Sequence, residues 1–215
     1  MIDLHTHTFF SDGELVPAEH LRRVEVLGYN AVAITDHADS SNMDWIIPRI
    51  VQAANDLNRY SKTRLIPGIE LTHVPPEMFA DLTARARKLG AIIVVAHGET
   101  PVEPVRSGTN RAAIEAGIDI LSHPGLITIE DAKAAAGKGV FLELSGRKGH
   151  SLTNGHVAKI AQETSALLAV NADAHGPGDF LTAKMAETVA LGAGVSAERY
   201  AQIRKDMAEL VKGTG

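Results

Sequence analysis

The 215-residue chain contains no cysteine, and this absence excludes disulfide bonds, thiolate zinc sites and a cysteine nucleophile. Aromatic residues make up only 4% of the chain, whereas aliphatic residues are plentiful, which is typical of a parallel sheet covered by helices. No apolar run approaches about 18 residues, the length of a membrane span, and no signal-peptide pattern opens the chain. We therefore expect a soluble, cytoplasmic protein that does not bind to membranes.

The chain also lacks an excess of positive charge. It has 21 basic and 26 acidic residues, so its formal net charge is −5. This balance argues against a broad basic surface and makes nucleic acid an unlikely partner. The phosphate-binding patterns G-x-x-x-x-G-K-[ST] and G-x-G-x-x-G are absent as well, so any phosphate group would have to be bound by other means.

The most informative feature that is present is the pair His5 and His7, with Asp3 just before it. Residues 2–7 alternate between apolar and polar side chains, which predicts a β-strand with both imidazoles on one face. Asp12 follows after a short turn. Alone, the pair fits metal ligation and fits two hydrogen-bonded polar residues at a strand end, because such a motif needs structural context.

The same arrangement recurs along the chain, because one predicted strand after another ends in a side chain that can bind metal. The pairs of strand and residue are 31–34 with His37, 65–69 with Glu70, 92–96 with His97, 118–121 with His123, and 167–170 with Asp173 and His175. The strand at 140–144 ends instead near a basic loop. Core packing does not explain this regularity, and we predict a metal site to which the strand ends contribute together.

Helical patterns separate the strands. They cover residues 17–27, 44–60, 75–89, 110–116, 129–136, 157–162, 180–191 and 196–211. This alternation of strand and helix predicts a parallel sheet, either open and doubly wound or closed into a barrel. Because six of seven strands carry a candidate ligand at the C-terminal end, we favour the barrel, in which these ends share one mouth. No linker is visible, so we expect a single domain over residues 1–215.

The chain resembles a known family, the PHP (polymerase and histidinol phosphatase) family, in its stand-alone phosphoesterase type. The matching pieces are DLHTHT and SDG at 3–13, ITDH at 34–37, GIE at 68–70, AHG at 96–98, LSHPG at 121–125 and NADAHG at 171–176. The resemblance implies an α/β fold, a distorted (β/α)7 TIM-like barrel that holds two or three divalent metal ions at the C-terminal mouth of its strands.

Carried over residue by residue, the resemblance implies three metal positions. One ion takes His5, His7 and Asp173; Glu70 bridges it to a second ion held by His97 and His123; a third ion takes Asp12, His37 and His175. Some relatives have a histidine where Asp12 stands, so the third position is richer in oxygen here. Imidazole and carboxylate ligands suit Zn, Mn and Fe, and the choice among these metals stays open.

The resemblance also implies the chemistry, a metal-dependent phosphoester hydrolysis by a hydroxide that bridges two ions. Glu70, Asp173 and His175 are then catalytic, and Arg106, Arg147 and Lys148 are candidate contacts of the substrate phosphate. We expect a phosphatase for a small phosphomonoester, such as histidinol phosphate, a sugar phosphate or a nucleotide. The alternatives are a nuclease or nucleotide phosphodiesterase and, less favoured, a non-catalytic binding module stabilised by metal.

The sequence assigns no definite function to several other polar residues. Asp36 is expected to support its neighbours, and His20 to be a surface or packing residue. The functions of His73, Glu143, His150 and His156 are not determined by the sequence, nor is the oligomeric state.

Overall fold

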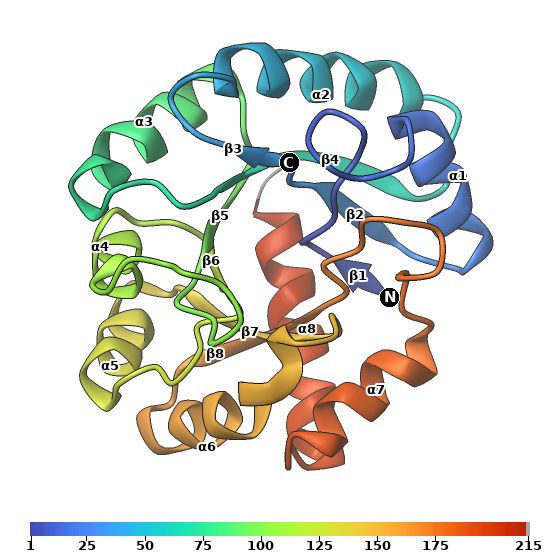
Figure 1. Cartoon of the computed structure of the whole chain (residues 1–215). Helices are drawn as coiled ribbons and strands as arrows, with labels where there is room; N and C mark the ends of the chain where they lie inside the picture. Colours follow the sequence, from blue (N-terminus) through green and yellow to red (C-terminus); the bar gives the residue numbers. More distant parts are fainter. Residues whose placement is uncertain (214–215) are drawn as a thin grey trace.

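The computed structural model describes residues 1–213. Its strands follow one another around a strongly curved parallel sheet (Figure 1). The strands are β1 (Ile2–Asp3), β2 (Ala31–Ile34), β3 (His37–Ala38), β4 (Arg64–Leu71), β5 (Ile93–His97), β6 (Ile120–Ser122), β7 (Phe141–Ser145) and β8 (Leu167–Asn171). Their order is β1-β2-β4-β5-β6-β7-β8, and β3 pairs with β4. Neighbours in sequence are therefore neighbours in the sheet.

The segments that follow β1 and β8 close this sheet into a barrel. Thr6 and Ala174 form an isolated parallel bridge. The backbone N–H of Asp173 donates to the carbonyl oxygen of His5 at 3.0 Å. The prediction of a closed barrel rather than an open sheet is thus confirmed.

Buried side chains complete the seam below this bridge. The Leu4 N–H donates to Asn171 Oδ1 at 2.9 Å, and the Ala172 N–H donates to Asp3 Oδ2 at 3.0 Å. Burial raises the pKa of Asp3 to about 7, although the hydrogen bonds from the backbone of His5 and Ala172 act in the opposite direction. At the seam, side chains therefore add to the backbone hydrogen bonds that close the barrel.

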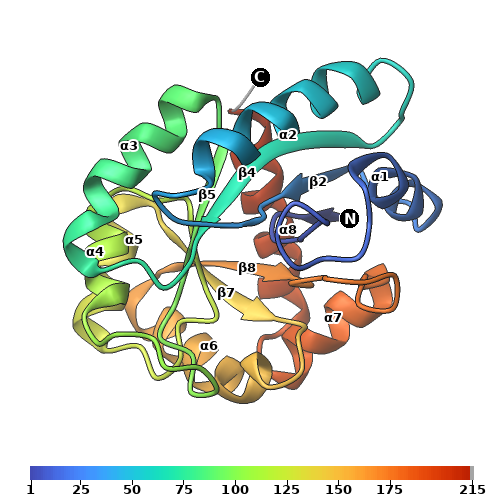
Figure 2. The ribbon, with the colours of Figure 1, turned by 45° about the horizontal axis from the view of Figure 1, so that its top comes forward.

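The described part of the chain has eight α-helices, of which α1 to α7 surround the sheet and α8 lies across one end (Figures 1 and 2). They are α1 (Pro17–Val26), α2 (Met43–Leu57), α3 (Phe79–Leu89), α4 (Thr109–Glu115), α5 (Ile129–Lys138), α6 (Asn154–Thr164), α7 (Ala183–Gly192) and α8 (Ala197–Lys212), with short 3₁₀ turns at Pro76–Met78 and His150–Thr153. None of the helices within residues 1–213 is long and apolar enough to cross a membrane.

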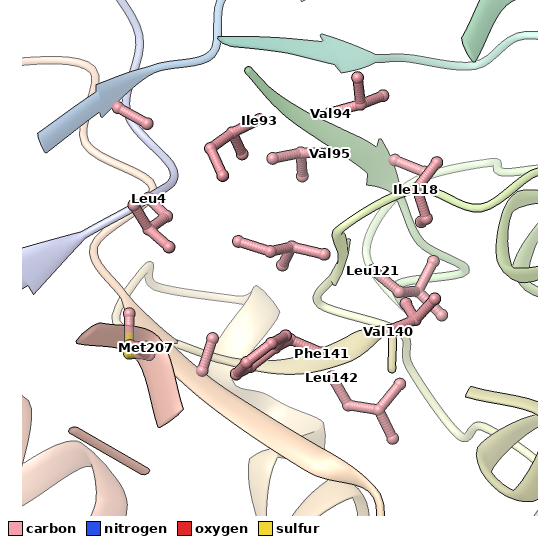
Figure 3. Packing of buried hydrophobic residues seen from close by; sticks show 14 of the residues in the cluster. Leu4, Ile93, Val94, Val95, Ile118, Leu121, Val140, Phe141, Leu142 and Met207 are labelled. Carbon is pink, nitrogen blue, oxygen red and sulfur yellow. The ribbon is translucent and has the colours of Figure 1, made fainter. Parts of the chain in front are cut away.

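Helix α8 closes the end of the barrel at which the strands begin. The Arg199 side chain donates to the carbonyl oxygen of Ala166, just before β8, and the Arg64 side chain, at the start of β4, donates to that of Val211. Met207 from the same helix is 3% exposed and lies among core residues of the barrel (Figure 3). Helix α8 thus covers the end opposite to the C-terminal strand ends, where the predicted ligands lie.

The strand predicted at 31–34 coincides with β2, but His37 does not end this strand: it starts a separate one, β3. Between them the Thr35 N–H donates to the carbonyl oxygen of Thr6, and Asp36 accepts from the Glu70 N–H through its backbone carbonyl. After this interruption His37 pairs in register with Glu70 on β4.

His20 is a packing residue, buried under α1 with 1% of its surface exposed. Its ring meets Phe180 edge-on at 4.9 Å between centroids, and neither ring nitrogen has a hydrogen-bond partner among the described residues. Burial lowers the pKa of His20 to about 4. The folded chain thus keeps an imidazole neutral that the unfolded chain protonates near its ordinary pKa of about 6.5.

This difference predicts a pH-dependent stability that His20→Leu removes. Below about pH 6.5 the unfolded chain binds a proton that the folded chain does not, so stability is lost as the pH falls toward 4. At pH 5 the loss from His20 is about 2 kcal/mol. Denaturant unfolding at pH 7 and pH 5 should show that the variant gains this amount relative to the wild type. An equal pH dependence in both proteins would contradict the assignment.

Candidate metal centre

The nine predicted metal ligands lie at the same end of the barrel. They come from the segment after β1 (His5, His7 and Asp12), from β3 (His37), β4 (Glu70) and β5 (His97), and from the segments after β6 (His123) and β8 (Asp173 and His175). The inner members are at most 2% exposed: His5, His7, Glu70, His97, His123 and Asp173. Parallel strands bring their C-terminal ends to one edge, which is why residues so distant in sequence meet here.

Glu70 occupies the middle of the site and is fully buried. Its Oε1 lies 3.2 Å from His5 Nε2 and 3.9 Å from His123 Nε2, while its Oε2 lies 2.6 Å from His37 Nδ1. The Ser122 hydroxyl donates to Oε1 at 2.8 Å. The carboxylate thus faces imidazoles on both of its oxygens.

Asp173 faces the same space from the other side of the seam. Its Oδ1 lies 3.3 Å from His7 Nε2, and its Oδ2 lies 3.7 Å from His123 Nε2. The backbone of Asp173 has φ +53°, in the left-handed region that a non-glycine residue rarely adopts. Burial raises the pKa of this carboxyl to about 7, against the nearby His5. A cation at this position would keep the carboxylate ionised.

A second group lies at the outer side of the mouth, where Asp12 meets His37 and His175. Asp12 Oδ1 is 3.2 Å from His175 Nε2 and 3.6 Å from His37 Nε2. The ring of His7 lies 4.2 Å from the rings of both histidines, and ligand atoms of all four residues are within 4.8 Å of one another. His7 therefore stands between the inner ligands and this group.

Asp36 supports the loop that carries Asp12. Its carboxylate accepts hydrogen bonds from the backbone N–H and hydroxyl of Thr8 at 2.8 and 2.7 Å, and from the Ser11 hydroxyl at 2.7 Å. Asp36 thus determines the course of the chain from His7 to Asp12, and the structure agrees with its expected supporting function.

Glu143 orients His5. Its Oε2 lies 2.8 Å from His5 Nδ1 and accepts from Asn171 Nδ2 at 3.0 Å. A carboxylate on one ring nitrogen fixes the imidazole so that the other nitrogen is available to a metal ion. Burial would lower the pKa of His5, but Glu143, Glu70 and Asp173 outweigh it and raise this pKa well above its ordinary value. The imidazole therefore favours its charged form beside these carboxylates.

Sequence reasoning missed one acidic residue of the mouth, Glu103, and left two neighbouring histidines undecided. Glu103 Oε2 lies 3.1 Å from both His73 Nε2 and His97 Nε2, and its Oε1 lies 3.4 Å from His150 Nε2. Glu103 stands in the loop between β5 and α4 and ends no strand, so the strand-end pattern carries no signal for it.

Two of the three candidate phosphate contacts, Arg147 and Lys148, line one cleft beside the outer group of ligands. Arg147 Nη1 is 2.6 Å from His175 Nδ1 and donates to the backbone oxygen of Asp173 at 3.1 Å. Arg147 and the exposed Lys148 line a cleft of about 640 Å³ that also includes Asp12 and His175. This cleft places cationic groups beside the outer group of ligands.

Two other residues have partners away from this cleft. Arg106 forms an ion pair with Glu77 at 3.0 Å, and both side chains are more than 60% exposed. His156 Nε2 lies 2.8 Å from the carbonyl oxygen of Ile127, a contact between α6 and the loop before α5.

The residues of the mouth fit divalent metal ions. Nitrogen and oxygen donors gather in five groups of three or four whose ligand atoms lie within 4.8 Å of one another. Among the described residues, His7 Nδ1 is buried without a hydrogen-bond partner, whereas His5 Nε2 and His7 Nε2 face carboxylate oxygens at 3.2 and 3.3 Å. Because buried carboxylates are costly unless positive charge is nearby, divalent ions bound among these side chains would stabilise the arrangement. The absence of thiolate ligands leaves Zn, Mn and Fe suitable.

Comparison with known proteins gives the family. Residues 3–175 match the PHP domain, and the chain belongs to the PHP family. An uncharacterized protein of Methanocaldococcus jannaschii is 47% identical over 196 residues, which is 90% of each chain.

Solved structures share the fold at low sequence identity. A candidate histidinol phosphatase from Listeria monocytogenes has a TM-score of 0.55 at 12% identity, over 83% of this chain and 97% of that one. A candidate metal-dependent phosphoesterase from Bifidobacterium adolescentis has a TM-score of 0.50 at 17% identity, over 91% of this chain and 97% of that one. A Xaa-Pro dipeptidase has a TM-score of 0.65 at 12% identity, over 99% of this chain and 75% of that one. This barrel therefore also occurs in an enzyme that cleaves peptide bonds.

If the cluster binds ions, metal removal should destabilise the fold. A ligand at a hundredfold excess over its Kd stabilises the folded state by about 2.7 kcal/mol for each site. We expect the Tm to fall when a strong chelator removes the metal and to recover when Zn²⁺ or Mn²⁺ is added. Thermal unfolding followed by circular dichroism measures this change. An unchanged Tm after verified metal removal would show that the cluster is not coupled to folding.

Glu143→Gln should weaken metal binding without removing a ligand. The amide keeps the size of the side chain but loses the charge that holds His5, and losses of supporting groups of this kind cost about 10–100-fold in affinity. Competition with a coloured chelator measures the Kd. The matched control is Glu163→Gln, because Glu163 lies on the exposed face of α6 with a 46% exposed side chain. Equal affinities in the two variants would contradict the orienting function.

Proposed function

We propose that the chain is a metal-dependent phosphoester hydrolase that acts on a small phosphomonoester. The observation that carries this proposal is the buried Glu70 carboxylate between His5, His37 and His123, with the Arg147 guanidinium at the edge of the adjoining cleft. Membership of the PHP family and the fold shared with two candidate phosphate-ester hydrolases support it.

The proposed ligands are the nine residues of the three expected positions. When bound, two or three divalent ions lower the pKa of water toward neutrality and stabilise negative charge that develops on phosphoryl oxygens. The protein contributes the positions: Glu70 faces two sets of imidazoles, Glu143 orients His5, and Asp36 holds the loop of Asp12. A buried, water-poor mouth strengthens each of these electrostatic interactions.

Arg147 and Lys148 bind the phosphoryl group in this proposal. The guanidinium of Arg147 can donate two parallel hydrogen bonds to phosphoryl oxygens, and its contacts with His175 and Asp173 direct it toward the ligand groups. Arg106 contributes less, because Glu77 already pairs with it at the surface. Without a glycine-rich phosphate loop, these cations and the ions supply the charge that the phosphate needs.

The size of the cleft and the net charge of the chain support the monoester preference. About 640 Å³ accommodates a small molecule, and the net charge of −5 does not attract a polynucleotide. The proposed substrate class includes nucleotides, sugar phosphates and histidinol phosphate.

The proposal predicts that the protein releases phosphate from an aryl phosphate only when metal is supplied. Arg147→Ala should lower kcat/KM by about 10- to 100-fold, because a charge-assisted hydrogen bond contributes about 1.5–3 kcal/mol. The control is Arg22→Ala, whose side chain is 70% exposed on α1 and pairs with Glu25. A phosphate-ester panel with Zn, Mn, Fe and Mg tested separately measures the activity.

The same panel separates the alternatives. Efficient cleavage of a diester or oligonucleotide with poor cleavage of monoesters would replace the phosphatase by a phosphodiesterase or nuclease. Inactivity toward both classes with full metal occupancy would favour a binding module.

A further inference from the structure

Glu103 lies among histidines at the mouth but belongs to none of the three expected metal positions. Its carboxylate lies within 3.4 Å of one nitrogen from each of three histidines, His73, His97 and His150. Of these, only His97 belongs to the ligand set that the family resemblance implies. The mouth therefore contains more metal-binding side chains than that set requires.

The loop of Glu103 is held at both ends, so the position of its carboxylate is built into the fold. The N–H groups of Gly108 and Asn110 donate to Glu99 Oε1 at 3.0 and 2.9 Å. The Glu99 N–H in turn donates to Asn110 Oδ1 at 3.0 Å. These bonds tie the beginning of the loop to its end, and Glu103 lies between them.

His150 is directed into the mouth and is only 4% exposed. Its Nδ1 lies 2.8 Å from the Thr100 hydroxyl, and its ring stacks on that of His123 with 4.0 Å between centroids. Its Nε2 faces two carboxylates, Glu103 Oε1 at 3.4 Å and Asp173 Oδ2 at 3.9 Å. Because the Thr100 hydroxyl occupies Nδ1, the Nε2 of His150 is available to a metal ion.

His150 belongs with the inner histidines rather than with a separate site. Ligand atoms of His97, His123 and His150 all lie within 4.8 Å of one another. His97 Nδ1 faces the carbonyl oxygen of Gly98 at 3.2 Å, so His97 has one nitrogen, Nε2, to offer to an ion. With that nitrogen used at the inner position, an outer ion would keep only His73 and Glu103.

We propose that His150 and Glu103 are additional ligands of the ion that Glu70, His97 and His123 bind. This assignment rests on the proposed metal dependence but not on the substrate. Three imidazoles and two carboxylates form a donor set that favours a borderline cation such as Zn²⁺ over Mg²⁺. They also make this position more completely coordinated than the Asp12, His37 and His175 group. The ion held here should be the last one that a chelator removes.

The test is a Zn²⁺ titration of the metal-free full chain against a coloured chelator, with the Co²⁺ absorption spectrum as a second readout. We expect His150→Ala and Glu103→Gln each to weaken the tightest Zn²⁺ site at least tenfold and to change the Co²⁺ spectrum. The matched controls, His156→Ala and Glu77→Gln, should behave as the wild type. Because the Glu103 side chain is 38% exposed, Glu103→Gln keeps the test valid if His150→Ala does not fold.

Two results would overturn the assignment. One is a tightest Zn²⁺ site and a Co²⁺ spectrum that neither variant changes. The other is the loss of one whole ion in Glu103→Gln while the tightest site keeps its affinity, which would assign Glu103 to a separate outer ion with His73. Neither readout needs hydrolysis, so an inactive wild-type protein would contradict the proposed function and leave the ligand assignment standing.

Discussion

The burial of the Glu70 carboxylate among histidines is the constraint on which the rest of the mouth depends. Burial would raise the pKa of Glu70, but His5 and His37 outweigh it and lower this pKa well below its ordinary value. A buried negative charge must be matched by positive charge nearby. Protonated imidazoles provide it in the metal-free chain, and divalent ions can provide it in the loaded one.

This constraint explains why so many supporting groups surround the ligands. Glu143 holds His5, Asp36 holds the loop of Asp12, and Ser122 donates to Glu70. Glu143 stands within β7, Ser122 ends β6 and Asp36 lies between β2 and β3, so the sheet positions both the ligands and their partners. The two-residue break between β2 and β3 belongs to the same scheme, because it brings His37 level with Glu70.

Much of the fold and of the metal centre could be predicted from the sequence, because the spacing of apolar residues and the positions of polar residues at strand ends are strong signals. Strand ends of a parallel sheet share one edge, so His97, His123 and Asp173 could be placed together without coordinates. Helix boundaries with clear caps were also predictable: Ser196 accepts from the Arg199 N–H at the start of α8. Glu103 could not be found, because its position depends on the path of a loop that hydrogen bonds between Glu99 and Asn110 close, and no pattern in the sequence predicts that path. The break at Thr35 depends on a contact with the distant residue Thr6 in the same way.

Because the metal centre lies across the seam of the barrel, metal binding has a consequence for folding. Asp3 and Leu4 bond to residues 169 and 167 positions away, so the closure of the barrel must overcome a large loss of chain entropy. The ligands His5 and His7 stand on one side of this seam and Asp173 on the other. An ion bound between them would tie the two ends of the barrel together. In a chain without cysteine, it would act as the cross-link that a disulfide forms in other proteins.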